Sequence, residues 1–221
     1  MKLLLTSNGL CNKTIANALW ELIGKPFSKT NLSFIPTAAN VEEGDKWWLI
    51  DDLSNCKKLG FKQIDIVDIS AIEKNLWLPR LKQADVLLFG GGNTFHLMYW
   101  LEKSVLAKLL PKLLKTRVYV GISAGSMVAG HAIKLTQAKR LYYPDLKGKY
   151  ENEKGLDLVN FHIRPHLNNK FFPYVNEKNL TKLSNEIKEK IYALDDEMAI
   201  KVEGDKLQVV GEGNYLVFNK T

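Results

Sequence analysis

The sequence predicts an α/β protein in which a mostly parallel sheet is covered by helices on both faces. Runs of continuous apolar residues alternate with segments whose apolar residues recur at helical spacing, as expected for parallel strands buried on both sides. Two glycine-bearing turns, 90–92 and 121–125, directly follow such runs. Towards the C-terminus, consecutive short strand-like runs predict an antiparallel extension of the sheet.

Apolar periodicity assigns the elements in chain order. Strands are predicted at 2–6, 32–35, 64–69, 85–89, 118–120, 133–136, 156–163, 191–194, 198–203 and 206–218. Helices are predicted at 15–23, 42–59, 95–101, 105–114, between 124 and 131, and at 176–190. Pro111 is expected to kink its helix, 72–81 to be a connecting segment that ends near Pro79, 137–157 to be irregular, and Gly204-Asp205 to form a hairpin turn.

Composition indicates one globular domain over residues 1–221. Of these residues 46% are hydrophobic and 25% are charged, which is enough apolar material for a large core. The net charge of +7 is spread over the chain. Because no recognition motif or arginine-rich stripe accompanies it, we expect no nucleic-acid partner.

The cysteines and the apolar segments predict a cytoplasmic protein. Cys11 and Cys56 are not in a metal-ligand spacing, and free thiols suit a reducing compartment. The N-terminal MKLLLTSNG has too few apolar residues for a signal peptide, and no stretch approaches the ~20 apolar residues of a membrane span. Trp47 and Trp48 are expected to pack on the sheet or on a second copy of the chain, so a monomer and a homodimer are both compatible.

The segment RVYVGISAGSMVAG at 117–130 carries the first functional signal. A β-branched and aromatic run enters Gly121-Ile122-Ser123-Ala124-Gly125, and small residues that can open a helix follow. This Gly-x-Ser-x-Gly pattern predicts a nucleophile elbow, a sharp turn that presents a serine hydroxyl at the end of a strand. We therefore expect Ser123 to be the nucleophile of an acyl-transfer reaction.

A serine nucleophile requires a base, and the chain contains four histidines. His96 and His131 are placed inside or at the end of predicted helices, where packing or capping explains them. His166 follows a predicted strand and Pro165, and is thus presented from a loop. His166 is our candidate base, and His162, within the strand, is the alternative.

The acid that orients the histidine is expected in Asp195-Asp196-Glu197, directly after the predicted strand 191–194. Asp196 is the first choice and Glu197 the second, with Asp195 assigned to the turn. The resulting order is serine, histidine, acid. The ordinary hydrolase order of serine, acid, histidine would instead require Asp145 or Asp157 with His162 or His166.

Backbone amides are expected to bind the oxyanion. Gly90-Gly91-Gly92 follows a buried strand, and glycine lets the backbone approach a ligand closely. The amides of Gly91 and Gly92 are therefore candidates, beside that of Ala124 at the start of a helix. Asn93 or Thr94 is expected to cap the following helix, and Asn93 is also a candidate for substrate binding.

Four segments together resemble the peptidase E family of serine peptidases, the aspartyl dipeptidases, which are related to cyanophycinases. These segments are GGGNTFHL at 90–97, YVGISAGSMV at 119–128, IRPHLNN at 163–169 and ALDDEMAIKV at 193–202. The resemblance implies a fold similar to class I glutamine amidotransferases, hydrolysis of short peptides from the N-terminal end, and no metal or cofactor. It places the family's nucleophile on Ser123 and its histidine on His166.

Two features depart from the family pattern. The family's acid is typically a glutamate, and the matching position here is Asp196. The segment after the elbow helix, TQAKRLYYPDLKGKYENEKG, is basic and rich in tyrosine, where the family has an acidic stretch tied to recognition of an N-terminal aspartate. Lys139, Arg140 and Arg164 are candidates for pairing with an acidic side chain or carboxylate of the substrate.

The sequence thus predicts a serine peptidase that cleaves short peptides, with Asp-Xaa dipeptides among the candidate substrates. An esterase or other amide hydrolase with the ordinary triad order is the first alternative. A binding protein that has kept the shape of the site without turnover is the second.

Overall fold

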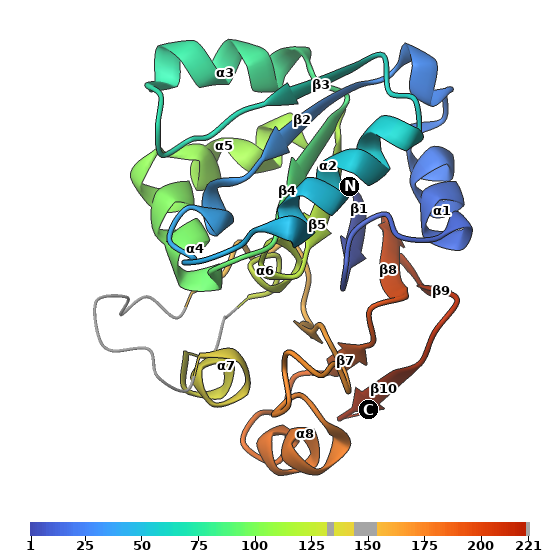
Figure 1. Cartoon of the computed structure of the whole chain (residues 1–221), viewed down its shortest axis with the longest axis vertical. Coiled ribbons are helices and arrows are strands. Elements are labelled where there is room, and N and C mark those ends of the chain that lie inside the picture. Colours follow the sequence, from blue (N-terminus) through green and yellow to red (C-terminus); the bar gives the residue numbers. More distant parts are fainter. Residues whose placement is uncertain (132–134, 144–153, 220–221) are drawn as a thin grey trace.

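The computed structural model describes residues 1–131, 135–143 and 154–219. In this part of the chain, a seven-stranded sheet has the order β3-β2-β4-β5-β1-β8-β9 (Figure 1). The strands from β3 to β1 are parallel, and β8 and β9 continue the sheet in antiparallel orientation. The bounds are β1 Lys2–Thr6, β2 Asn31–Ile35, β3 Gln63–Ile66, β4 Val86–Phe89, β5 Val118–Ile122, β8 Met198–Glu203 and β9 Lys206–Gly211.

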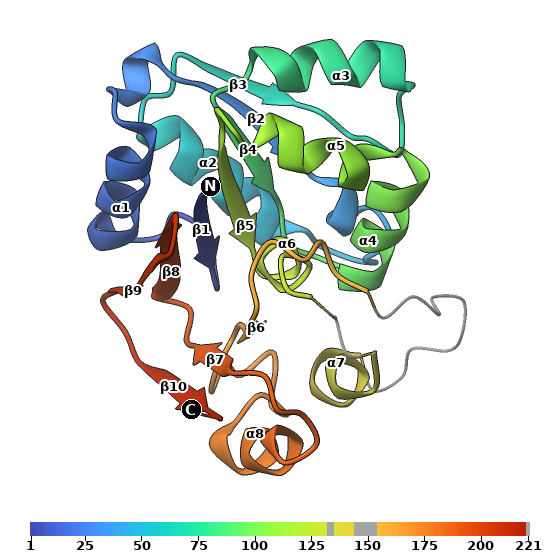
Figure 2. The same cartoon turned by 180° about the vertical axis from the view of Figure 1, so that it is seen from behind.

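Helices cover both faces of this sheet (Figures 1 and 2). Side chains alternate along β1, so that Leu4 packs with one set of helices while Leu3 and Leu5 pack with the other. The helices on the Leu4 face are α1 Lys13–Ile23 and α2 Trp47–Lys58, and those on the opposite face are α3 Lys74–Gln83, α4 Thr94–Lys103 and α5 Leu106–Leu113. The core is therefore two apolar layers on either side of the sheet.

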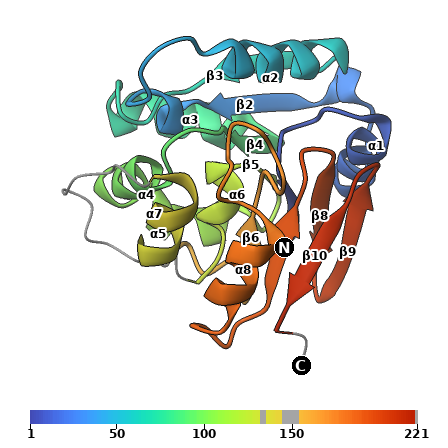
Figure 3. The ribbon, with the colours of Figure 1, turned by 60° about the horizontal axis from the view of Figure 1, so that its bottom comes forward.

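A smaller sheet lies beyond the carboxyl ends of β1 and β5, with strand order β10-β7-β6 (Figure 1). Figure 3 shows β10 on the same side of the molecule as β8 and β9. The connections after β6 and β7 carry His166 and Asp196 to the edge where β5 ends. The bounds are β6 His162–Arg164, β7 Ile191–Leu194 and β10 Tyr215–Phe218, with α6 Ala124–Met127, α7 Leu135–Tyr142 and α8 Glu177–Ser184.

The predicted fold class, a parallel-rich α/β sheet between two helical layers with antiparallel C-terminal strands, is confirmed. Two predicted connections are helices instead. The connecting segment predicted at 72–81 is instead helix α3, with Pro79 inside it, because the side chains of Trp77 and Leu81 are buried against the sheet. Helix α7 replaces the end of the strand predicted at 133–136 and the first part of the irregular segment. Its sequence, LTQAKRLY, is rich in helix formers. Residues 132–134 and 144–153 lie outside the described part.

The other differences from the prediction concern where strands and helices begin and end. The strand predicted at 156–163 is reduced to β6, because backbone groups before it bond to the chain that follows the elbow, as in the bond from Leu156 N to Val128 O of 2.7 Å. The strand predicted at 206–218 is divided between β9 and β10, which belong to different sheets. The chain turns between them at Gly211, whose φ is 141°. Helices α2 and α8 are shorter than predicted, and Pro111 lies inside α5.

Candidate active site

Ser123 lies in a strained turn between β5 and α6. Its φ is 47° and its ψ is −104°, a conformation that costs a residue with a side chain about 1–3 kcal/mol. Glycines on both sides make the turn possible. A Cβ on Gly121 would lie 2.6 Å from the backbone of Gly125, and one on Gly125 would lie 2.1 Å from the carbonyl oxygen of Phe89. The strand and helix therefore meet tightly, and the turn presents the serine hydroxyl to the pocket.

His166 is held beside this hydroxyl. Its Nε2 lies 2.9 Å from Ser123 Oγ, and its backbone N–H donates to Ser7 Oγ at 2.8 Å. One face of the imidazole stacks on Phe172, with a centroid separation of 4.3 Å and an angle of 11°. With a φ of 65°, His166 occupies the left-handed region, as expected for a side chain redirected at the end of a strand. These contacts fix the ring plane towards the serine.

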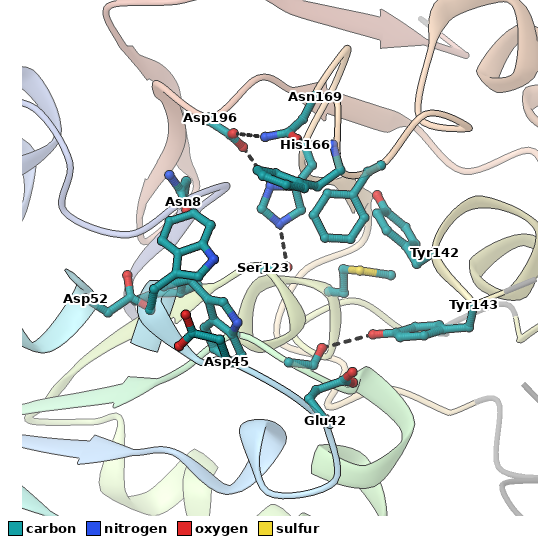
Figure 4. Close-up of a pocket in the computed structure, with 18 of the residues that line it drawn as sticks. Asn8, Glu42, Asp45, Asp52, Ser123, Tyr142, Tyr143, His166, Asn169 and Asp196 are labelled. Atoms are coloured by element: carbon teal, nitrogen blue, oxygen red, sulfur yellow. Dashed lines mark hydrogen bonds and ion pairs between the residues drawn. The ribbon is translucent and has the colours of Figure 1, made fainter. Parts of the chain in front are cut away.

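Asp196 lies on the other side of the imidazole, 2.6 Å from Oδ1 to His166 Nδ1. Asn169 Nδ2 donates to Oδ2 (Figure 4). Ser7 Oγ donates to Oδ1 at 3.4 Å. Burial alone would raise the pKa of the Asp196 carboxyl, but the hydrogen bonds and charge of His166, together with Asn169 and Ser7, outweigh burial and lower the pKa.

The ionised carboxylate determines the histidine tautomer. A carboxylate only accepts hydrogen bonds, so His166 Nδ1 must carry the proton that Asp196 receives. Nε2 of the neutral ring is then the acceptor for the hydroxyl of Ser123. The arrangement can remove the serine proton without any change in the position of the imidazole.

The three acids at 195–197 have separate positions. Asp195 accepts backbone hydrogen bonds from Glu197, at 3.0 Å, and from Asn214, which closes the turn between β7 and β8. The side chain of Glu197 is exposed, and its backbone oxygen accepts bonds from Asn12 and Glu212. Only the Asp196 carboxyl contacts His166 among these acids.

The glycine loop between β4 and α4 borders the serine. A Cβ on Gly91 would lie 3.6 Å from Ser123 Cβ and 3.7 Å from the ring of Trp48. Gly92 has a φ of 121°, and a Cβ there would lie 2.4 Å from Ala38 O, so this position requires glycine, whereas a Cβ on Gly91 would make only ordinary contacts. Gly91 and Gly92 line the same pocket as Ser123, and Ala124 directly after the serine begins α6.

Tyr143 is hydrogen-bonded to this loop and to the start of α4. Its hydroxyl donates to Gly92 O at 2.9 Å and accepts from Thr94 N at 3.2 Å. Burial raises the pKa of Tyr143 to about 12, although the bonds with Thr94 oppose the rise, so the phenol stays protonated and remains a donor near neutral pH.

Neither of the two candidates for substrate binding faces the pocket, although the predicted helix cap at Asn93 is confirmed. Asn93 caps α4 by accepting from Phe95 N and His96 N, at 3.1 and 3.0 Å. Arg164 is only 2% exposed within β6, where burial lowers the pKa of its guanidinium. Neither residue lines the pocket around Ser123. Sequence position identified the strand end and the loop correctly, but it could not determine which way these side chains point.

The alternative histidines and acids lie elsewhere. His131 Nδ1 lies 3.0 Å from Asp157 Oδ1, and both side chains are exposed. His162 is buried in β6. Asp145, the other acid of the ordinary triad order, lies outside the described residues. In the described part of the chain, the only histidine that contacts the Ser123 hydroxyl is His166.

The pocket around Ser123 has a volume of about 390 Å³ and is rich in carboxylates and aromatic rings (Figure 4). Trp47 and Trp48 line it and belong to neither apolar layer of the sheet, which corrects the expectation that they pack on the sheet. Sequence analysis also missed several other lining residues, for which only their proximity to the strand ends and to the histidine segment was a signal. These are Asn8, Glu42, Glu43, Asp45, Asp52, Met127, Tyr142, Tyr143, Asn169, Phe171 and Phe172.

Neither metal binding nor membrane spanning finds support in the described residues. There, no three His, Cys, Asp or Glu side chains are grouped so that they could hold a metal ion. None of the helices in the same ranges combines the length and the apolar character that crossing a bilayer requires.

Comparison with known proteins agrees with this fold. Peptidase family S51 matches residues 3–210. An uncharacterized peptidase of Pasteurella multocida is 30% identical over 146 residues, which are 66% of this chain and 68% of the relative. Peptidase E of Shewanella oneidensis is 39% identical over 106 residues, which are 47% of this chain and only 42% of that relative.

A solved structure supports the fold. A Listeria monocytogenes EGD-e protein assigned as a peptidase E has a TM-score of 0.77 with this chain, covering 96% of it and 98% of its own chain at 24% identity. At this identity the likeness concerns the fold alone. Taken with the family match, the class is that of a serine-type peptidase. The chain belongs to peptidase family S51, and the resemblance to peptidase E found in the sequence is confirmed.

Proposed function

We propose that the protein hydrolyses short peptides through a Ser123–His166–Asp196 triad and an acyl-enzyme. The observation that carries this proposal is the continuous hydrogen-bonded series from Ser123 Oγ through both ring nitrogens of His166 to Asp196, with distances of 2.9 and 2.6 Å. The series lies in the pocket of about 390 Å³, within the size range of small-ligand sites.

Acylation begins with attack of Ser123 Oγ on the carbonyl carbon of the scissile peptide bond. His166 Nε2 takes the hydroxyl proton, and Asp196 stabilises the resulting imidazolium through Nδ1–H. The negative charge on the carbonyl oxygen is received by the amides of Ala124, Gly91 and Gly92. The imidazolium then gives its proton to the leaving amine as the C–N bond breaks, which leaves the acyl group on Ser123.

Deacylation repeats these steps with water. His166 Nε2 removes a proton from a water molecule that attacks the ester carbon, and the same amides hold the second oxyanion. Collapse of this intermediate breaks the bond to Ser123 Oγ, which takes the proton back from the imidazolium. The products are the free acid and the regenerated site.

The shape of the pocket supports the proposal that the substrates are short peptides. Trp47 on α2 and Phe171 after β6 approach each other with ring centroids 6.0 Å apart, and both line the pocket. Two exposed rings at this separation limit the space for a long chain. The resemblance to aspartyl dipeptidases makes Asp-Xaa dipeptides the first substrates to assay. We also propose a cytoplasmic location, supported by the free thiols of Cys11 and Cys56.

The test is hydrolysis of a panel of dipeptides by the wild type and by Ser123→Ala. We expect the substitution to lower kcat by about four to six orders of magnitude, as for other serine triads. An esterase with the ordinary triad order would instead lose activity in Asp157→Ala, and a silent binding protein would hydrolyse nothing before mutation. Full hydrolysis by Ser123→Ala would refute the proposed mechanism.

A further inference from the structure

The pocket around Ser123 carries an excess of negative charge. Five carboxylates line it, and among the described lining residues there is no lysine or arginine. Of the cations that the sequence offered for an acidic substrate, Arg164 is buried in β6 and Arg140 pairs with Glu186 at 2.6 Å. The five lining carboxylates belong to Glu42, Glu43, Asp45, Asp52 and Asp196.

Asp52 is the most unusual member of this group. It is 7% exposed, yet no hydrogen bond or ion pair from the described residues reaches its carboxyl group. Its Oδ1 lies so close to Gly9 that a Cβ there would be 2.5 Å away. A buried carboxylate without a partner is costly, so a group that pairs with it on binding would recover that cost.

Asp52 belongs to the same wall of the pocket as the reacting groups. It follows Trp48 by four positions on α2, so the two side chains share a face of the helix. The ring of Trp48 lies 3.7 Å from a Cβ built on Gly91, which in turn would be 3.6 Å from Ser123 Cβ. A ligand that contacts Trp48 therefore reaches both Ser123 and Asp52.

A second unsatisfied oxygen lies across the pocket. Oε1 of Glu42 is buried and has no hydrogen-bond partner in the described part of the chain. Figure 4 shows Glu42 on the side of Tyr143, whereas Asp52 lies on the side of Asn8, with Ser123 between them. Acceptor oxygens without a donor thus occur on both sides of the nucleophile. The lysines nearest to these acids do not line this pocket: Lys46 acts on Glu42 by its charge, and Lys58 borders a neighbouring hollow with Asp52.

We propose that Asp52 binds a positively charged group of the substrate, so that the pocket selects cationic peptides over those with an N-terminal aspartate. This inference names the substrate class of the proposed function and rests on it. Indole rings such as those of Trp47 and Trp48 attract ammonium and guanidinium groups and cover their aliphatic stems. The cation is the side chain of a lysine or arginine. An α-amino group offers Asp52 the same charge, but aspartyl peptides carry one too, so it could not give this selection.

A binding experiment separates these sources and does not depend on turnover. Calorimetry measures the binding of four ligands to Ser123→Ala. They are lysine amide, norleucine amide, Nα-acetyl-lysine amide and aspartate amide. A charge-assisted contact predicts that lysine amide binds about ten- to a hundredfold more tightly than aspartate amide. Asp52→Asn, added to Ser123→Ala, is expected to abolish most of this advantage, while the exposed neighbour Asp51→Asn changes it by less than about threefold.

The pattern across ligands identifies the cation. If Asp52→Asn weakens the binding of lysine amide and Nα-acetyl-lysine amide but not that of norleucine amide, the lysine side chain binds Asp52. If it weakens lysine and norleucine amides equally and leaves the acetylated ligand unchanged, Asp52 binds the α-amino group, which overturns the proposed selection against an N-terminal aspartate. Equal binding of aspartate and lysine amides, or no effect of Asp52→Asn on any ligand, overturns the proposal. Retained fluorophosphonate labelling of the wild type in that case would show that only the specificity inference has failed, not the proposed function.

Discussion

Nε2 of His166 lies 2.9 Å from Oγ of Ser123, although 43 positions separate the two residues in the chain. Neither residue alone would hold this geometry. The serine is raised by a turn with φ of 47°, and the imidazole is fixed by Phe172 on its face and by Asp196 at Nδ1. The pair depends on two sheets meeting at one edge, where β5 and β6 both end.

The first prediction concerns the identity of the acid. Asp196→Ala removes the group that holds His166 in the productive tautomer, so kcat should fall by about three to four orders of magnitude. Glu197→Ala is the matched control, because its exposed side chain adjoins Asp196 in sequence. Steady-state kinetics on one dipeptide compares them. A larger loss in Glu197→Ala than in Asp196→Ala would assign the role to the glutamate.

The second prediction uses the buried carboxyl of Asp52. Burial, with a further contribution from Asp51, raises its pKa from 3.8 to about 7. The unfolded chain therefore loses this proton near its ordinary pKa, while the folded protein keeps it until about pH 7. Because the folded state binds more protons in that interval, its stability falls as pH rises from about 4 to about 7.

Asp52→Asn should remove this penalty. Each unit of pKa difference between the folded and unfolded states corresponds to about 1.4 kcal/mol. The free energy of unfolding of the variant should therefore exceed that of the wild type by up to about 4 kcal/mol at pH 8.5, and by little at about pH 4. The neighbouring thiols stay protonated in the folded protein over this pH range, because burial raises the pKa of Cys11 to about 11 and that of Cys56 to about 12. Lys58 and Asp51 border a neighbouring hollow together with Asp52. Urea unfolding at both pH values checks the difference, and equal stability of variant and wild type at pH 8.5 would contradict it.

The third prediction concerns Tyr143, whose hydroxyl positions the glycine loop. Tyr143→Phe keeps the ring and removes the hydrogen bonds to Gly92 O and Thr94 N. Loss of about 1 kcal/mol of loop positioning should lower kcat by roughly five- to tenfold. KM should change little, because the ring still lines the pocket. An unchanged kcat would show that the loop keeps its position without the phenol.

The fourth prediction concerns substrate length. Trp47→Ala and Phe171→Ala each remove one ring of the pair that borders the pocket, so kcat/KM for tetrapeptides should rise relative to dipeptides by roughly threefold or more. Trp20→Ala is the control, since that indole is 50% exposed on α1 and does not line the pocket. The ratio of rates on paired di- and tetrapeptides measures the effect. A similar ratio in all four proteins would exclude a role of this ring pair.

Sequence reasoning was most successful where backbone chemistry constrains the residue. The elbow at Ser123 and the loop at Gly92 require glycines at fixed positions, so their pattern is visible in the chain. His166 and Asp196 were found because each follows an apolar strand, and parallel strands direct their ends to one edge.

Side-chain direction could not be predicted in the same way. Asn93 and Arg164 occupy the expected segments, but one caps α4 and the other is buried in β6. Trp48 and Asp52 were missed because apolar spacing on a helix does not distinguish a core face from a pocket wall. Only the packing of α2 against the loop at Gly9 brings them to the nucleophile.

The most direct test of the central claim is to map the residue that reacts with a fluorophosphonate probe, by mass spectrometry of the intact and digested protein. The probe should label Ser123 alone, Ser123→Ala should take up none, and His166→Ala should react about a thousandfold or more slowly than His131→Ala, whose imidazole pairs with Asp157 at the surface. Labelling of a different serine, or equal labelling rates in the two histidine variants, would contradict the proposed site.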